Sequence, residues 1–201
     1  MPTEIRLIPL TNIKPLLNAY IYKTFKDRMK KTRKNLLPFD LLLAVEKSPD
    51  EDTYILVGGY DRYYYLREYT ETNETNCIVE EFVSTEETLF KTLRRLLPKG
   101  DADINNKLWV IQTLQGYDIS LNRIVEETGI PLNDLKNKYT YRSDIPKDLI
   151  NDHTTPKTLN EVSKLDVANE SKLFLYKRAG LPKRNSNRLT GIVLSYRWLS
   201  R

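Results

Sequence analysis

Amide and cationic side chains lie close together between residues 133 and 142. An asparagine side chain can make paired hydrogen bonds to adenine, and a lysine can bind guanine or a phosphate group. Lys138 and Arg142 have the chemistry of phosphate contacts, whereas DNA repels Asp134 unless it accepts a bond from cytosine or caps a helix. The predicted DNA-contacting residues of this segment are Asn133, Lys136, Asn137, Lys138 and Arg142.

The residues around this group have the pattern of two helices joined by a tight turn. Ser120 can cap a helix over 121–128, because its hydroxyl can accept from a free backbone amide. Gly129 follows where a left-handed residue ends such a helix, and Pro131 has the backbone angle of a helix's first turn. A second helix is predicted over 132–139. This order is typical of the helix-turn-helix, which inserts its second helix into the major groove, although an ordinary helical hairpin has the same pattern.

Two glycines at the end of an apolar stretch form a second candidate site. Gly58 and Gly59 follow the strand predicted over 53–57 and precede a helix predicted from Tyr60. Free backbone amides at the start of a helix suit a phosphate group, and Arg62 would add a charged donor. A purely structural strand-to-helix turn explains the same residues.

The charges of the chain are segregated along the sequence. Seven cations stand against one acid between Lys23 and Lys34, and from Glu68 to Glu87 there are seven glutamates and no lysine or arginine. Basic blocks of this kind are typical of a polyanion partner, although a solvated helix face has the same composition. Another basic stretch holds further predicted DNA contacts, Lys183, Arg184 and Arg188.

Several classes of site and location are disfavoured by composition. The single cysteine, Cys77, excludes an internal disulfide, and the single histidine, His153, argues against zinc chemistry and histidine-based catalysis. No apolar run approaches the ~18–20 residues of a membrane span, and no secretory signal pattern opens the sequence. We therefore expect a cytoplasmic protein with no membrane contact.

The pattern of apolar residues changes near residue 100. Strands are expected over 4–10, 41–45, 53–57 and 78–83, and helices over 21–34, 60–70 and 85–97. The polar residues 49–52 favour a hairpin between the strands over 41–45 and 53–57. Only helices are expected beyond Pro98. The tyrosines of 60–69 are better explained by core packing than by stacking on bases. The predicted fold class is α+β: a small mixed domain over 1–99 followed by an all-α helix-turn-helix domain over 100–201.

The order of these motifs resembles the ParB family of partition proteins, whose N-terminal fold is shared with sulfiredoxin. The similarity lies in residues 5–10 and 13–15, in 34–39, in the strand and Gly-x-x-Arg turn over 54–62, and in 129–139 followed by Ile145-Pro146. The resemblance implies the mixed fold, recognition of double-stranded DNA, and a triphosphate site, which is for CTP in many members. Gly59 and Arg62 match the family's phosphate-binding box, and Arg94 and Arg95, which stand where the family has its Glu-Asn box, can still meet an anion. With Gly58 of the glycine turn, these are the predicted nucleotide contacts.

Two departures from the family pattern weaken the nucleotide prediction. Asp61 stands where the family has a second arginine, and residues 92–96 contain no carboxylate. We therefore assign no catalytic residue and no certain cofactor from the sequence. The binding of CTP and the formation of a homodimer stay open. We expect a sequence-specific DNA-binding protein acting in partition or as a plasmid- or phage-type transcriptional regulator. The alternative is a nucleotide-dependent enzyme, a phosphotransferase or nuclease, built on the first domain.

Overall fold

The computed structural model describes residues 4–18, 21, 23–32, 35, 37–49, 52–98, 104–151 and 153–181. Two compact units divide the chain, Met1–Ile119 and Ser120–Arg201. The boundary between the units lies after helix α4 (Ile104–Gly116), whereas the sequence predicts it between residues 99 and 100. Helix α4 therefore belongs to the unit that contains the sheet. The fold class predicted from the sequence, α+β, is confirmed.

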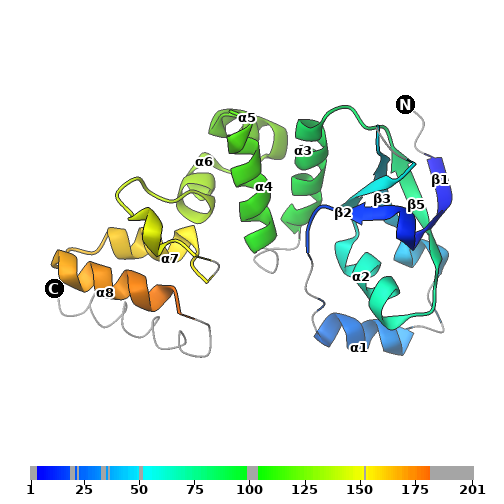
Figure 1. Cartoon of the computed structure of the whole chain (residues 1–201), viewed down its shortest axis with the longest axis horizontal. Helices are drawn as coiled ribbons and strands as arrows, with labels where there is room; N and C mark the ends of the chain where they lie inside the picture. Colours follow the sequence, from blue (N-terminus) through cyan, green and yellow to red (C-terminus); the bar gives the residue numbers. More distant parts are fainter. Residues whose placement is uncertain are drawn as a thin grey trace. The chain divides into compact units, whose positions relative to one another are not determined.

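A five-stranded mixed sheet forms the centre of the first unit (Figure 1). Its spatial order is β1-β5-β3-β4-β2. β1 pairs with β5 and β3 with β4 in antiparallel fashion, whereas β3–β5 and β2–β4 are parallel. The strands are β1 (Glu4–Pro9), β2 (Ile13–Pro15), β3 (Leu43–Lys47), β4 (Tyr54–Gly58) and β5 (Glu74–Glu80).

The predicted strands are all found, with shifted ends. The β3–β4 pair is the hairpin expected from the polar segment between two apolar runs. β5 begins at Glu74, earlier than the predicted residue 78, because its first residues pair with β1: Thr75 lies opposite Ile8. A strand can extend beyond its apolar pattern where a neighbouring strand supplies hydrogen bonds.

The core of the first unit lies between the sheet and its helices, α1 (Lys23–Thr32), α2 (Tyr60–Tyr69) and α3 (Thr85–Leu96). The aromatic residues of α2 supply much of it, since Tyr60, Tyr63 and Tyr65 are buried. The hydroxyl of Tyr63 donates to the carbonyl of Ile13 on β2 at 3.1 Å, and the ring of Tyr65 stacks on Tyr69. Core packing by some of these tyrosines, as predicted, is confirmed.

The second unit is helical over the residues that the structure describes. Its long helices are α5 (Leu121–Thr128), α7 (Pro156–Ser163) and α8 (Asn169–Ala179), and α6 (Leu132–Asp134) is a single short turn. A cluster of buried residues joins α7 and α8; it consists of Ile145, Leu159, Val162, Leu175, Tyr176 and Ala179. Within the described ranges, none of the helices is long and apolar enough to cross a bilayer. Among all residues that the structure describes, there is no group of three or more acidic, histidine or cysteine side chains that could hold a metal ion.

Candidate DNA interface

The first helix of the predicted motif, α5, begins and ends where the sequence indicates. The hydroxyl of Ser120 accepts a hydrogen bond from the backbone amide of Arg123 at 3.2 Å. Gly129 ends the helix in the left-handed region, with φ of 72°, and its amide donates to the carbonyl of Val125 at 2.7 Å. A side chain at this φ would be strained. Local capping chemistry therefore sets the length of α5.

The second helix of the motif, residues 132–139, is not a regular α-helix. It begins after Pro131 as α6 and continues as a π-helical segment, Leu135–Tyr139. Leu135 and Tyr139 are buried, while Asn133 and Lys136 are exposed. The helix predicted over these residues is found, with a wider final turn. It packs its apolar residues inward and leaves polar ones outside.

The two asparagines predicted to contact adenine are joined to each other. The side-chain nitrogen of Asn137 donates to the carbonyl oxygen of Asn133 at 2.8 Å and to its side-chain oxygen at 2.7 Å. The side-chain oxygen of Asn137 accepts from Nζ of Lys164 at 3.1 Å. The amide of Asn137 must exchange these partners before it can bind a base.

The cations of the motif differ in how they are paired. Lys138 lies 2.9 Å from the carboxylate of Asp134, one turn earlier, which accounts for the acid in a segment of otherwise favourable charge. Nε of Arg142 lies 3.1 Å from Asp144. Nζ of Lys136 forms no hydrogen bond or ion pair with any described residue. Of the predicted DNA-contacting cations that the structure describes, Lys136 is the one whose side chain has no ion pair and can bind DNA without breaking one.

A buried asparagine binds the end of the second helix, a role that no pattern in the sequence indicates. The side-chain nitrogen of Asn160, on α7, lies 3.3, 3.2 and 2.9 Å from the carbonyl oxygens of Lys136, Asn137 and Thr140. Its side-chain oxygen accepts from the amide of Arg142 at 3.1 Å. Carbonyls at a helix end need such partners, because no further turn supplies them. Asn160 is 2% exposed.

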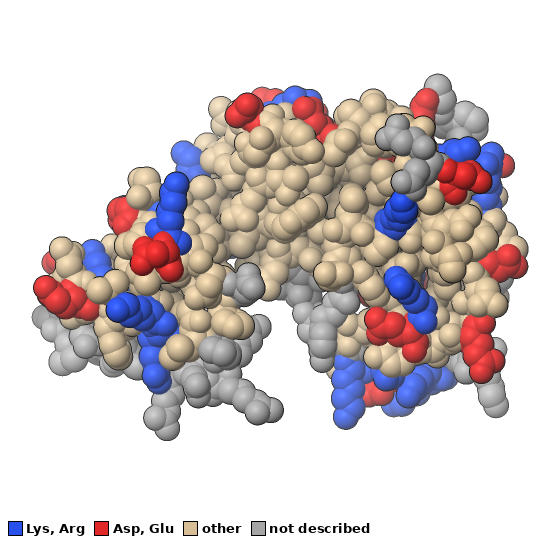
Figure 2. All heavy atoms as spheres, viewed as in Figure 1, with Lys and Arg blue, Asp and Glu red and all other residues tan. Residues whose placement is uncertain are grey.

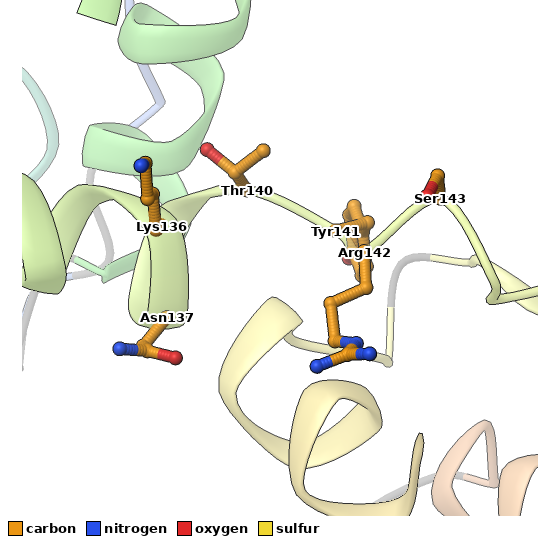
Figure 3. A pocket seen from close by; sticks show the side chains of 6 residues that line it. All are labelled: Lys136, Asn137, Thr140, Tyr141, Arg142 and Ser143. Carbon is orange, nitrogen blue, oxygen red and sulfur yellow. The ribbon is translucent and has the colours of Figure 1, made fainter. Parts of the chain in front are cut away.

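A surface pocket of about 340 Å³ follows the second helix (Figure 3). In this view Lys136 and Thr140 point to one side of the segment, and Asn137 and Arg142 to the other. The structure thus brings Lys136, Asn137 and Arg142 to one pocket. The remaining lining residues are Thr140, Tyr141 and Ser143. Three other predicted contacts, Lys183, Arg184 and Arg188, lie outside the described residues.

The glycine turn of the first unit is closely packed. A Cβ atom on Gly58 would lie 2.6 Å from Cδ of Arg95, and one on Gly59 would lie 2.9 Å from a methyl carbon of Leu43. Gly59 also has a φ of 85°, in the left-handed region. Both glycines therefore have structural reasons to be glycine.

The arginines predicted at the nucleotide have partners within the fold. Nη1 of Arg62 donates to the carbonyl of Leu42 at 2.8 Å. Arg94 pairs with Glu87 at 2.6 Å, and Arg95 pairs with Glu80. An anion at the turn would have to compete with these groups. The side chain of Arg95 lies beside Gly58, as is expected if both bind one nucleotide. However, the guanidinium group of Arg95 is already paired with the carboxylate of Glu80.

A buried carboxylate that the sequence did not indicate lies between β3 and α3. Glu46 is 0% exposed; the hydroxyl of Thr88 donates to one of its oxygens, and Nζ of Lys91 lies 2.5 Å from the other. Lys91 also donates to the carbonyl of Glu81 at 3.0 Å. The signal that could have revealed this group is an acid at the end of an apolar strand, with Thr88 and Lys91 three residues apart on a helix. The network holds α3 on the sheet.

No family model matches the chain, and no curated protein matches it. Among solved structures, it is similar to the C-terminally truncated chromosome-partitioning protein ParB from Caulobacter crescentus complexed to the centromeric parS site. The identity is 11%, with 94% of this chain and 92% of that chain covered and a TM-score of 0.45. For the same protein complexed with CTP-gamma-S, the identity is 13%, the coverage 94% and 99%, and the TM-score 0.38.

Proposed function

We propose that this chain binds double-stranded DNA of a preferred sequence through the helix-turn-helix of residues 120–139. The observation that carries the proposal is the second helix: Leu135 and Tyr139 fix it in the fold, and Lys136 stands exposed and unpaired among the described residues. A helix held in this way can present side chains to base edges in the major groove.

The proposed cellular role of the chain is based on sequence-specific DNA binding. A sequence-specific DNA-binding protein of ParB type acts in DNA partition, or as a plasmid- or phage-type regulator of transcription. The similarity to ParB motifs over residues 54–62 and 129–139 favours partition. Lys136 contacts a base or a phosphate, and Asn133 and Asn137 address adenine after their mutual hydrogen bonds are exchanged. Lys138, Arg142, Lys183, Arg184 and Arg188 are proposed phosphate contacts.

Selection from a genomic DNA pool, followed by fluorescence anisotropy on the selected duplex, tests the proposal. Wild-type protein should bind the selected duplex more tightly than a scrambled duplex. The change Lys136→Ala should weaken the selected complex by about 1–3 kcal/mol if Lys136 contacts a base. Lys177→Ala, an exposed lysine of α8, is the matched control. Equal affinity for both duplexes, or full affinity in Lys136→Ala, would contradict the proposal.

A second candidate is a nucleotide-dependent phosphotransferase or nuclease, with the nucleotide at Gly58 and Gly59. The observation in its favour is Nη1 of Arg95, which is buried without a hydrogen-bond partner among the described residues, beside Gly58. Isothermal titration with CTP, and with ATP and magnesium, separates this candidate from the first. Binding that is lost in Arg62→Ala supports it, and a flat titration with both nucleotides rejects it.

A further inference from the structure

The outward surface of α1 carries a dense group of cations. The helix has the sequence KTFKDRMKKT, in which five lysines and arginines accompany one aspartate. Lys23, Arg28, Lys30 and Lys31 are exposed. Figure 2 shows blue side chains gathered at the part of the first unit where Figure 1 places α1. We call Lys23, Lys26, Arg28, Lys30 and Lys31 the α1 surface.

The α1 surface differs from β1, β3 and α3 in how its charges are balanced. On the sheet, Arg6 pairs with Glu4 and Lys47 with Asp52. On α3, the cations pair with glutamates. The ammonium groups of Lys23, Lys30 and Lys31 form no ion pair with any residue that the structure describes. Five cations held on one helix against a single carboxylate, Asp27, repel each other on balance, and a polyanion relieves that repulsion.

The inward side of α1 is already occupied by the fold. Met29 is 6% exposed, and the ring of Phe25 meets that of Tyr65 edge to face, with centroids 6.2 Å apart. Nζ of Lys26 lies 3.6 Å from the centre of the Tyr69 ring. A basic helix that binds a membrane needs a free apolar face to insert between lipids. Here that face packs on α2, so only the charged side of α1 is available to a partner.

We propose that the α1 surface is a second DNA-binding surface, which contacts the phosphate backbone without reading bases. It is separate from the helix-turn-helix, since it lies in the first unit. The proposal rests on the proposed function only in taking DNA as the polyanion. Lys23, Lys30 and Lys31 would each neutralise a phosphate and release a condensed counterion.

The test measures binding of the full chain to a scrambled duplex at several salt concentrations. In the double variant Lys30→Gln/Lys31→Gln, the slope of log K against log salt should become shallower by roughly 1.8, at about 0.9 for each lost contact. The control variant Arg6→Gln/Lys47→Gln removes the same charge from ion-paired positions on the sheet and should keep the slope. Thermal melting by circular dichroism confirms that each variant is folded.

Two further measurements make the outcome decisive. The ratio of affinities for the selected and scrambled duplexes should stay unchanged in Lys30→Gln/Lys31→Gln, whereas Lys136→Ala lowers it. The salt slope on the scrambled duplex tests the α1 surface even if the helix-turn-helix proposal fails, because that slope does not depend on base recognition. An unchanged salt slope in the α1 variant overturns the inference. So does loss of binding to phosphatidylserine-containing vesicles while the affinity for DNA stays the same.

Discussion

The side-chain nitrogen of Asn160 lies 2.9 Å from the carbonyl oxygen of Thr140, the residue that follows the π-helical segment. The same nitrogen is within reach of two further carbonyls, and the side-chain oxygen binds the amide of Arg142. Helix α7 therefore fixes the end of the helix that we propose enters DNA.

Removal of this amide should loosen the second helix. Asn160→Ala removes the donor of three partly buried carbonyls and the acceptor of the Arg142 amide, so the free energy of unfolding should fall by about 1–3 kcal/mol. Hydrogen exchange of the amides of residues 139–142 should quicken more than that of α8. The ratio of affinities for selected and scrambled DNA should also fall, which global destabilisation alone would not cause. Unchanged exchange in this segment would show that Asn160 does not position the helix.

The carboxylate of Asp134 is expected to oppose DNA binding. Its ion pair with Lys138 spans 2.9 Å, so Asp134→Asn removes a charge repelled by phosphate and takes this carboxylate partner from Lys138. The affinity for scrambled DNA should rise, and the salt slope should steepen by about 0.9 if Lys138 gains one phosphate. Salt-dependent anisotropy measures both, with Glu170→Gln on α8 as the control. A weaker complex would indicate that Asp134 accepts a hydrogen bond from DNA.

The pairing of Glu46 with Lys91 should be important for the stability of the first unit. Glu46 is fully buried, and the side chain of Lys91 is 17% exposed. Lys91→Met leaves a buried carboxylate without its counter-charge, which should cost about 3–5 kcal/mol in urea unfolding. The double variant Glu46→Gln/Lys91→Met should recover part of this loss, because no buried charge remains. A loss below about 1 kcal/mol in Lys91→Met would argue against the buried pair.

Asp144 should make stability depend on acid pH. A hydrogen bond from Ser163, at 2.6 Å, and the neighbouring Arg142 lower the pKa of Asp144 below its ordinary value of 3.8. Because the folded pKa is the lower one, the contribution is complete above the unfolded pKa and is lost as pH falls through the folded pKa. In Ser163→Ala the pKa of Asp144 should rise towards 3.8, as NMR titration of its carboxyl would show. Ser171→Ala is the control, and an unmoved pKa in Ser163→Ala would refute the assignment.

Features that depend on neighbouring residues could be predicted from the sequence. The cap at Ser120 and the left-handed Gly129 act within a few residues, so the limits of α5 were correct. The apolar runs likewise indicated β3, β4 and their hairpin. The stacking of Tyr65 on Tyr69 follows from their spacing of four on a helix.

Features that depend on distant partners could not be predicted. Asn160 binds carbonyls more than twenty positions earlier, and Glu46 meets Lys91 45 positions later. Neither pairing leaves a periodic trace in the sequence. The wider turn at Leu135–Tyr139 has the same cause, since α7 supplies donors to its carbonyls. The predicted DNA and nucleotide contacts remain predictions, although the structure shows which of their charges are already paired.

The π-helical segment also makes the motif sensitive to length. A regular α-helix turns about 100° for each residue, and a π-helical turn advances each residue by less. A wide turn takes up about one residue more than a regular turn. A one-residue deletion within 135–139 would therefore restore the regular pitch and nearly keep the angular phase of the residues beyond it, but it would shift the carbonyls that Asn160 binds, including that of Thr140. Substitutions in this segment change single contacts, but a deletion replaces the wide turn itself. Related sequences that keep the same DNA target should therefore vary here in residue type and not in residue number.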